Sequence, residues 1–454
     1  IADYISIHAK WEKYEPQKTL KFVEGILKTY TKQAEPEVKK KKFLELSDVE
    51  KVVKKNFPHI WDETKIFLSI PCTLLLKDIS NPTGLIIEGP PSGNKTTIIS
   101  FGYGLGSLFY KSDDFTPRAF VSHASTVKAD QLKKIDLLPR IKNKVLLVPE
   151  LAPMFSRRKD DLVEVLGILT RVFDGEGLTS DSGTRGRRGY EGEYLFAFVG
   201  ATTPLSKGVW DTIGKLGNRW VFLSTKKQEK SEEYLVDDVL GAREFKKKLA
   251  DCRVAIQAYL SNLFDEYGGK YSVEWDREND NREIKRKLKK LTDLVCRLRA
   301  PVKIWKERDD KDEEQYSFAQ PIIEEPERLL TLFYNIARGH ALLNKRLRLN
   351  EDDWAVCLRI GLSTMPYERA QMFNLLLKHG GELTSLQIQN ELNCSQGNAS
   401  KIMKQLEILQ LVDKSTAGRD GFMVEIRLKD EFMWVLGEPA LDWIKEVEES
   451  KQSE

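Results

Sequence analysis

The sequence lacks any long hydrophobic run. No apolar stretch approaches the roughly 20 residues that a membrane-spanning helix requires, so we expect no membrane partner. The first residues also lack the pattern of a secretory signal peptide. Because the chain begins with Ile1 rather than methionine, we expect its native beginning to be missing.

Cysteine is scarce, and the cysteines that occur are scattered. There are five of them, and no two stand in a C-x-x-C arrangement. The absence of such pairs argues against a disulfide framework or a zinc site and fits a reducing compartment. We therefore expect a cytoplasmic location.

The sequence also lacks a strong charge of one sign. Its formal net charge is +3, although 31% of its residues are charged. Any nucleic-acid binding must therefore come from local basic patches rather than from a global field. A hydrophobic fraction of 41% supports globular cores, and a length of 454 residues predicts about three domains.

A turn of small residues between a predicted strand and a predicted helix is the most informative motif that is present. Residues 84–97 read GLIIEGPPSGNKTT, which matches the phosphate-binding pattern G-x-x-x-x-G-K-[ST] except that Asn94 replaces the glycine before the lysine. Asparagine tolerates left-handed backbone better than most residues, so the pattern survives this exchange. A turn that merely precedes Lys-Thr is the alternative, but strand, loop and helix follow in the required order.

This loop predicts a site for ATP and Mg²⁺. Backbone N–H groups of the loop and of the helix start can surround phosphates. Lys95 can reach the β and γ phosphates, and the hydroxyl of Thr96 can hold Mg²⁺. The predicted nucleotide contacts are Gly89, Pro90, Pro91, Ser92, Gly93, Asn94, Lys95, Thr96 and Thr97.

A carboxylate follows the apolar strand expected at 145–148. Glu150 is the predicted general base, and a helix-capping acid is the alternative role. The residue before such a glutamate is normally an aspartate that holds the water shell of the metal. Pro149 stands there instead. This departure would slow hydrolysis unless another acid, such as Asp160 or Asp161, compensates.

Two further side chains are predicted to act on the nucleotide. Thr203 follows the strand expected at 195–199 and would orient the attacking water, with Thr202 as the next candidate. Both threonines also suit a simple strand end. Arg219 directly precedes the last expected strand, and in a ring of subunits it would project into the γ-phosphate of a neighbour. A lone arginine before a strand means little, so this prediction depends on the phosphate loop.

Strands and helices alternate through the middle of the chain. The strands expected at 85–88, 118–122, 145–148, 195–199 and 220–223 are separated by helical stretches. This order predicts an α/β fold with a parallel sheet that is covered on both faces. We divide the chain into an N-terminal helical segment (1–60), the α/β core (61–225), a charged helical insertion or linker (226–325), a helix pair (326–365), a compact block (366–435) and a terminal helix and tail (436–454).

Together these motifs resemble the AAA+ ATPases, most of all the branch that holds the minichromosome maintenance (MCM) helicases and the magnesium-chelatase relatives. The resemblance covers roughly 61–225 and 326–430 and is one of motifs. It implies a P-loop AAA+ αβα sandwich with a helical lid. It also implies a homo-oligomeric ring, expected to be a hexamer, with ATP bound between subunits.

In that branch, hairpins inserted before the sensor strand reach into the pore of the ring. Residues 184–190 occupy this place and read TRGRRGY. The resemblance implies that Arg185, Arg187 and Arg188 contact a DNA backbone and that the tyrosine stacks on bases. From charge alone, a solvated loop explains the segment equally well.

The helix pair begins with Pro326 and Glu327, followed by apolar residues at helical spacing. It resembles the lid helix of this branch, in which an early arginine touches the nucleotide. Arg328 fills that place, and Arg338 is a weaker candidate. Residues 349–355 resemble the capped start of the next lid helix.

The block at 366–435 predicts two helices joined by a tight turn and followed by a hairpin, which resembles a winged helix. Ile402, Leu406 and Leu409 mark the core face of the second helix. If the block binds DNA, this helix enters the major groove and Arg419 meets phosphate. Binding of a protein partner is the alternative. The outward residues of the second helix are Gln396, Asn398, Ser400, Lys401 and Lys404.

The leading hypothesis is a ring-forming ATPase that acts on DNA as a helicase or translocase of MCM type, with Arg219 and Arg328 supplied across the subunit interface. The second hypothesis is a nucleotide-switched initiator, loader or regulator that binds DNA without unwinding it, which Pro149 favours. The third is a protein-remodelling ATPase. The arginine-rich insert argues against the third, because unfoldases generally present an aromatic and apolar pore loop.

Overall fold

The computed structural model of the chain describes residues 45–122, 129–183, 186–217, 219–225, 243–308, 314–417 and 423–437. Two of the expected DNA contacts, Arg185 and Arg419, lie outside these residues. So do most of the expected N-terminal helical segment and of the terminal helix and tail. None of the helices in the described ranges combines the length and the apolar character that a bilayer crossing requires.

A five-stranded parallel sheet forms the centre of the molecule. It contains β1 (Thr83–Glu88), β2 (Phe109–Lys111), β3 (Val145–Val148), β6 (Ala197–Thr202) and β7 (Trp220–Ser224), in the order β2-β3-β6-β1-β7. Every residue of β1, β3 and β6 is buried, as expected for a sheet with both faces covered. The predicted α/β fold with a parallel sheet is therefore confirmed.

One predicted strand is wrong. The segment 118–122 forms a 3₁₀ turn, η3 (Pro117–Ala119), and the edge strand is β2, which pairs with β3. A proline at the start of the segment cannot donate to a sheet ladder. The apolar side chains are buried without a strand, because the ring of Phe120 packs edge-on against Phe115 with 5.4 Å between centroids.

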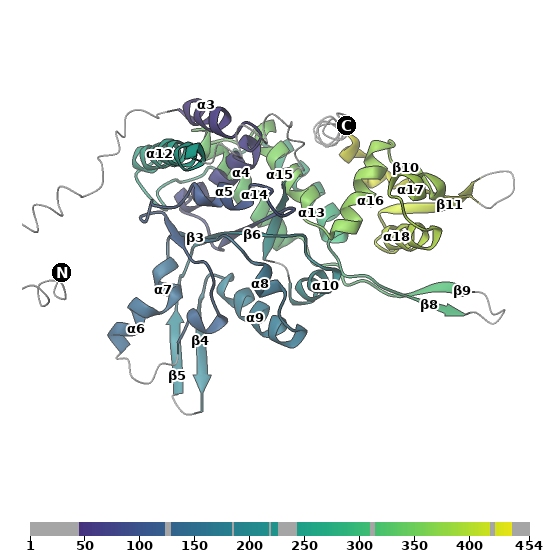
Figure 1. Cartoon of the computed structure of the whole chain (residues 1–454), viewed down its shortest axis with the longest axis horizontal. Helices are drawn as coiled ribbons and strands as arrows, with labels where there is room; N and C mark the ends of the chain where they lie inside the picture. The colour runs from purple at the N-terminus through teal and green to yellow at the C-terminus, as the bar shows by residue number, and fades with distance from the viewer. Residues whose placement is uncertain are drawn as a thin grey trace, which may run out of the picture.

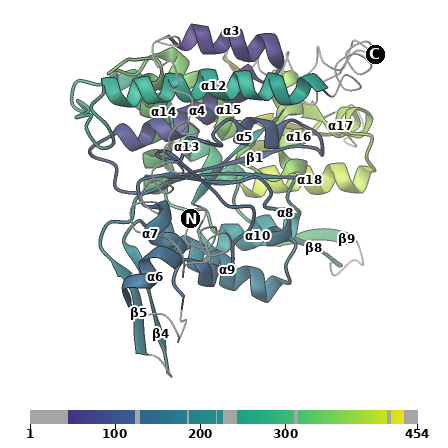
Figure 2. The same ribbon diagram turned by 60° about the vertical axis from the view of Figure 1, so that its left-hand side comes forward.

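Two layers of helices cover the sheet (Figure 1). One layer contains α4 (Trp61–Cys72), α5 (Lys95–Ser100), α14 (Glu327–Leu343) and α15 (Glu351–Ser363). The other contains α7 (Leu137–Ile141), α8 (Ala152–Phe155), α9 (Lys159–Val172) and α10 (Lys207–Leu216). Figure 2 shows the sheet between these layers, which bury separate hydrophobic clusters on its two faces.

The segment predicted as a charged helical insertion or linker is built into this core. Its helix α12 (Arg243–Glu266) packs on α3 (Leu46–Asn56), and α13 (Arg282–Leu298) packs on α14 and α15. The fully buried Ile284, Leu288 and Leu291 form the apolar face of α13, whose other side carries many charges. The segment also forms a hairpin of β8 (Lys303–Arg308) and β9 (Glu314–Ala319), which we did not predict from the sequence.

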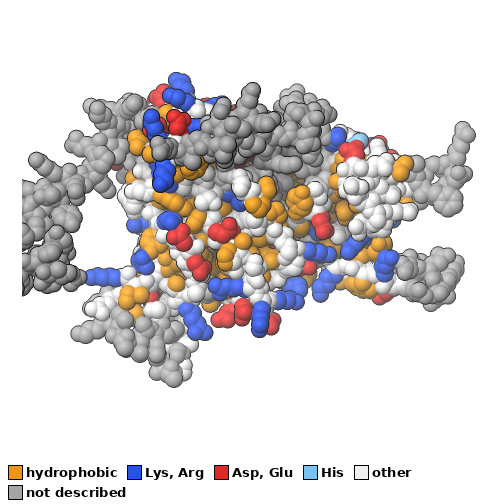
Figure 3. All heavy atoms as spheres, viewed as in Figure 1, with side chains coloured by type: hydrophobic (Ala, Val, Ile, Leu, Met, Phe, Trp, Pro, Cys, Tyr) orange, Lys and Arg blue, Asp and Glu red, His pale blue; other side chains and the backbone are white. Residues whose placement is uncertain are grey.

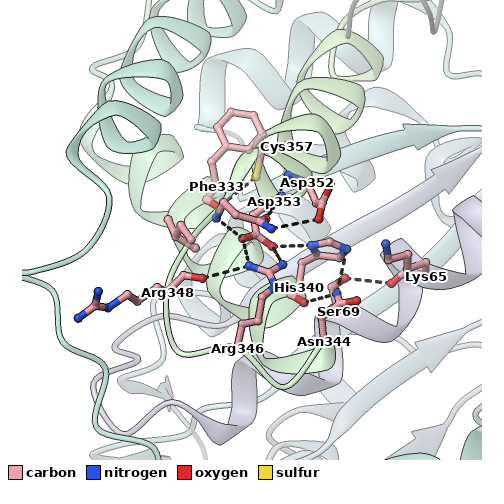
Figure 4. A network of polar contacts seen from close by, with 12 residues as sticks. Lys65, Ser69, Phe333, His340, Asn344, Arg346, Arg348, Asp352, Asp353 and Cys357 are labelled. Carbon is pink, nitrogen blue, oxygen red and sulfur yellow. Dashed lines mark hydrogen bonds and ion pairs between the residues drawn. The ribbon is translucent and has the colours of Figure 1, made fainter. Parts of the chain in front are cut away.

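A buried ionic network joins α14 to α15 (Figure 4). The Nδ1 atom of His340 lies 2.6 Å from Oδ1 of Asp353, and both side chains are fully buried. Arg346 donates to both oxygens of Asp353 at 2.8 Å. Asn350 completes a capping box with Asp353 at the start of α15. This network fixes the angle between the two helices of the predicted lid.

The C-terminal block contains three helices and a small antiparallel sheet. In chain order it consists of α16 (Tyr367–Lys378), β10 (Glu382–Thr384), α17 (Ser385–Glu391), α18 (Gln396–Ile408), β11 (Val412–Ala417) and β12 (Met423–Leu428), with sheet order β10-β12-β11. A capping box at Thr384 starts α17, and Asn393 with φ 46° makes the turn into α18. Trp434 in η5 (Asp430–Leu436) packs against Trp354 of α15 with the two rings tilted by 53° and 5.7 Å between ring centroids.

Candidate functional site

The loop that follows β1 is shaped by left-handed backbone. Ser92 has φ 62° and Asn94 has φ 58°, so the residue that replaces the usual glycine adopts the conformation the loop requires. The N–H of Gly93 donates to the carbonyl of Pro90 at 3.2 Å and closes the turn. A Cβ atom on Gly89 would lie 2.0 Å from Oγ1 of Thr225, so a larger residue here would require Thr225 to move.

The ammonium of Lys95 is held inside this loop. The side chain is 6% exposed, and its Nζ donates to the carbonyl oxygens of Gly89 at 2.8 Å and Pro90 at 2.6 Å. Burial lowers the pKa of Lys95, while the charges of Glu150 and Glu88 oppose this shift. Neutral carbonyls are weak partners for a buried cation, so an incoming anion can take the ammonium from them.

Three polar side chains end neighbouring strands beside the loop. Glu88 of β1 is in register with Thr202 of β6, and Val148 of β3 is in register with Gly200. Glu150 follows two residues after Val148, and the N–H of Leu151 donates to the carbonyl of Ala201 at 2.7 Å. Because carboxyl ends of parallel strands meet at one edge, two carboxylates and a hydroxyl border the phosphate loop.

Glu150, the predicted base, is exposed, and its Oε1 accepts the N–H of Ala152 at 2.9 Å. This bond caps the start of α8, which is the alternative role foreseen for the residue. The charge of Glu150 also reaches Lys95, so the two roles are compatible. Asp160 and Asp161, named as possible substitutes for the acid missing at Pro149, are exposed in the first turn of α9.

The two threonines at the end of β6 have different surroundings. Thr202 is fully buried, and its Oγ1 has no hydrogen-bond partner among the described residues. The carbonyl of Thr202 accepts the N–H of Gly89 at 3.2 Å and so positions the phosphate loop. Thr203 is half-buried at the turn that follows.

Sequence reasoning missed Glu88, the last residue of β1. It is 5% exposed, and its Oε1 accepts the N–H of Leu205 at 2.8 Å. Burial raises the pKa of Glu88 to about 7, although the Leu205 N–H and the charge of Lys95 oppose the shift. An acid at the end of the apolar run 85–87 was the available signal, because a buried strand rarely ends in an unpartnered charge.

Arg219, the predicted finger, is paired with an acid of its own chain. Its side chain is 9% exposed, and its Nη2 and Nε lie 3.1 Å and 3.2 Å from Oδ1 of Asp174 in the same chain. Arg328 is exposed at the start of α14. A Cβ on Gly217 would lie 3.0 Å from Nη1 of Arg219 and 3.6 Å from Nη1 of Arg328. The two predicted arginines therefore gather at one place on the surface.

This place lies at the opposite edge of the sheet from the phosphate loop. Trp220, which follows Arg219, is in register with Gly84 of β1. Five residues of strand separate Gly84 from Gly89, or roughly 17 Å at about 3.3 Å per residue. Arg219 therefore cannot serve the loop of its own chain, and any role at a phosphate requires a second subunit.

Arg338, the weaker lid candidate, is excluded from the nucleotide site. Its side chain is fully buried, pairs with Asp78 at 2.7 Å and lies 4.6 Å from the centroid of the Tyr334 ring. Its Nη2 also donates to Oδ1 of Asn335 at 2.5 Å. The arginine thus holds α14 to the segment before β1. The packing of α14 against α4 buries this side of the helix.

The arginine-rich insert forms a hairpin of β4 (Gly177–Ser182) and β5 (Gly186–Glu191) that extends away from the body (Figures 1 and 2). Arg187 is exposed and pairs with Glu191, whereas Arg188 is half-buried. The hydroxyl of Tyr190 donates to Oδ2 of Asp136 at 2.8 Å. This bond anchors the base of the hairpin, so the ring of Tyr190 is not the free stacking group that we expected.

Helix α18, the expected recognition helix, is partly covered. Gln396 and Asn398 are exposed, but Ser400, Lys401 and Lys404 are half-buried rather than fully outward. The hydroxyl of Tyr316 in β9 donates to the carbonyl of Gly397 at 3.1 Å. Nζ of Lys404 lies 5.4 Å from the ring centroid of Phe318 in the same strand. The hairpin β8–β9 therefore lies against the face proposed for DNA.

The core face of α18 agrees with its sequence pattern except at one position. Leu406 and Leu409 are fully buried, as are Ala399 and Met403. Ile402 is only half-buried at the margin of the core. Figure 3 shows acidic and basic side chains interspersed over the face of the molecule that it presents, rather than gathered by sign.

Within the described ranges, no group of three or more His, Cys, Asp or Glu side chains is arranged to hold a metal ion. No protein-family model and no curated protein matches the chain.

Proposed function

We propose that the chain is an ATPase of the AAA+ class that acts on DNA as a ring, as a helicase or translocase of MCM type. One observation carries the proposal of ATPase activity. Lys95 is buried in a glycine-containing loop at the carboxyl end of β1, and β1 has a neighbouring strand on each side in the sheet. The strand order β2-β3-β6-β1-β7 supports the same class. A ligand at the carboxyl edge of such a sheet is the general rule for open α/β folds.

The residues of the loop suit a nucleotide with Mg²⁺. A Cβ on Gly93 would lie 3.0 Å from the Pro90 carbonyl oxygen, so a side chain at this position would crowd the turn. Thr96 is exposed at the start of α5 and would hold Mg²⁺, which supplies charge neutralisation at the phosphates. Lys95 binds the phosphates after leaving its two backbone carbonyls.

The remaining residues supply the steps of hydrolysis. Glu150 accepts the proton of the attacking water, and Thr203 orients that water. Arg219 and Arg328, gathered beside Gly217, stabilise charge at the phosphate loop of a neighbouring subunit. The distance argument across the sheet supports supply in trans. The hairpin β4–β5 and the C-terminal block, which we interpret as a winged helix, contact DNA.

A nucleotide-switched DNA-binding protein without unwinding activity is the second candidate. Two observations favour it: Pro149 replaces the expected acid, and Arg219 is held by Asp174 rather than free for a neighbour. Slow turnover suits a switch better than a motor.

One experiment separates these candidates. Nucleotide binding, DNA binding with and without ATP, ATP turnover with and without single- and double-stranded DNA, and fork unwinding are measured for the native chain, Lys95→Ala and Arg219→Ala. Lys51→Ala on the exposed side of α3 is the control. A motor shows DNA-stimulated turnover that both site substitutions abolish. A switch shows ATP-dependent DNA binding with little turnover. Absence of nucleotide binding by the native chain rejects both.

A further inference from the structure

The buried carboxylate of Glu88 has no role in the mechanism described above. It connects three parts of the site: its own carbonyl accepts the N–H of Thr225 at 2.8 Å, its side chain accepts the N–H of Leu205 at 2.8 Å, and its charge acts on Lys95. The first two bonds tie β1 to the segments that follow β7 and β6. Leu205 lies two residues after Thr203.

Burial of this acid is costly unless something compensates it. A carboxylate that is 5% exposed must be neutralised or matched by a cation and hydrogen bonds. One backbone N–H and the charge of Lys95 are the favourable partners that the structure provides. A glutamine would make the bond to Leu205 equally well without this cost. The charge itself therefore calls for an explanation beyond a structural bond.

We propose that Glu88 is a positioning residue of the nucleotide site that balances the charge of Lys95 before nucleotide arrives and holds the Thr203 segment through Leu205. The inference rests on the ATPase function proposed above. It goes beyond that function because it assigns a second acid to the site, at the end of β1. The residues predicted from the sequence lie instead on the loop, after β3 and β6, and before β7.

The arrangement has a defined consequence for nucleotide binding. When a triphosphate draws Lys95 away from the loop carbonyls, an ionised Glu88 loses its counter-charge and faces a new anion. Ionised Glu88 therefore opposes binding, whereas protonated Glu88 does not. Among the residues that the structure describes, the charged groups that act on Glu88 are Lys95 from α5 and, through Lys95, Glu150 after β3. Nucleotide affinity should consequently be higher at pH 6 than at pH 8.

The test measures the affinity of a non-hydrolysable ATP analogue with Mg²⁺, by titration calorimetry on the full chain at pH 6 and pH 8. Glu88→Gln retains an acceptor for Leu205 and removes the charge. We expect it to bind about tenfold more tightly than the native chain at pH 8, with the difference falling below about threefold at pH 6. Its kcat should exceed that of Glu88→Ala, because glutamine keeps the bond that holds the Thr203 segment in place.

Glu88→Ala removes both the charge and the bond to Leu205, so its kcat should fall while its affinity at pH 8 still rises. Asp280→Asn serves as the matched control. Asp280 is also 5% exposed and accepts a backbone N–H, that of Leu349 at 3.1 Å, but it lies just before α13, in the segment predicted as an insertion or linker. This control should change neither quantity. Thermal melting of each variant checks that it is folded.

If Glu88→Gln and the native chain bind the analogue with equal affinity at both pH values, the charge of Glu88 has no effect on nucleotide binding. Glu88 would then only make a structural hydrogen bond to Leu205, and the inference would be overturned. That outcome leaves the ATPase proposal intact, because the native chain still binds nucleotide. A native chain that binds no nucleotide at pH 6 or pH 8 would instead remove the proposed function, and with it the inference.

Discussion

At the scale of single residues, Glu88 predicts an unusual dependence of stability on pH. Its pKa is raised from an ordinary value of 4.5 to about 7, so the folded protein binds a proton that the unfolded chain releases. The stability from this proton is full below pH 4.5 and is lost as the pH rises through 7. At about 1.4 kcal/mol per pKa unit, the loss approaches about 3 kcal/mol at pH 8.

Glu88→Gln removes this loss because glutamine does not ionise. We expect its free energy of unfolding in urea to match that of the native chain near pH 5 and to exceed it by about 2–3 kcal/mol at pH 8. The measurement needs no nucleotide and therefore stands apart from any enzymatic role. A constant difference across this pH range would show that the carboxylate is not held in its neutral form.

Residues with local chemistry were predictable, and residues defined by long-range partners were not. Lys95 and Asn94 belong to a continuous pattern whose backbone demands can be read directly from neighbouring letters. Glu88 depends on a backbone N–H 117 positions away, and Arg219 on an aspartate 45 positions earlier. Sequence spacing contains no record of such pairs. The pairing of Arg219 with Asp174 could therefore not be predicted, although its place before β7 was.

At the scale of elements, the junction of α14 and α15 depends on Asp353. Removing this carboxylate by Asp353→Ala leaves Arg346 and the buried His340 without their partner and breaks the capping box with Asn350. Loss of one member of a buried ionic network typically costs about 3–5 kcal/mol. We expect a decrease of this size in the free energy of unfolding, measured in urea at pH 7.

Asp352→Ala provides the matched control, because Asp352 is the exposed neighbour on the same turn of α15. Its loss should cost under about 1 kcal/mol. Similar effects of the two substitutions would mean that the network in Figure 4 contributes no more to the free energy of unfolding than an exposed side chain at the start of the helix does.

The hairpin β4–β5 is the element whose position suggests DNA contact most directly. The double substitution Arg187→Ala with Arg188→Ala should weaken DNA binding about tenfold near 0.1 M salt. It should also lower the slope of log K against log salt concentration by the amount expected for the loss of one to two phosphate contacts. Fluorescence anisotropy over a range of salt concentrations measures both. The charge-matched pair Lys51→Ala with Lys55→Ala lies on α3, at the far side of the body (Figure 1), and should have little effect. Equal losses in the two variants would indicate non-specific attraction only.

Elements with a strong local pattern were predicted, and elements that depend on their partners were not. The strand 145–148 is an uninterrupted apolar run and was found as expected. The three-residue β2 owes its existence to pairing with β3, whereas the apolar segment after Pro117 buries its side chains in a turn. The charges around residues 303–319 suggested a solvated linker, but alternating side chains there form a hairpin that packs on α18.

At the scale of the whole molecule, the two halves of the proposed catalytic site face in opposite directions. The phosphate loop lies at the carboxyl edge of the sheet, and Arg219 with Arg328 lies at the amino edge. In a single chain, neither Arg219 nor Arg328 lies at the edge of the sheet where the loop after β1 lies. Head-to-tail assembly is the arrangement that brings the two edges together, and closed head-to-tail interfaces generate rings. The bond between Arg219 and Asp174 would open as the phosphate of a neighbour competes for the guanidinium.

This geometry predicts that two inactive variants restore one another. In an equimolar mixture of Lys95→Ala and Arg219→Ala chains, an intact site forms wherever the loop of an Arg219→Ala subunit meets the arginine of a Lys95→Ala subunit. Random assembly gives roughly one quarter of interfaces of this kind, so ATP turnover should recover to about that fraction of the native value. The control replaces Lys95→Ala with the doubly substituted chain, which offers neither group and should restore nothing. Recovery in that control, or its absence in the first mixture despite assembly into an oligomer by light scattering, would exclude an arginine acting in trans.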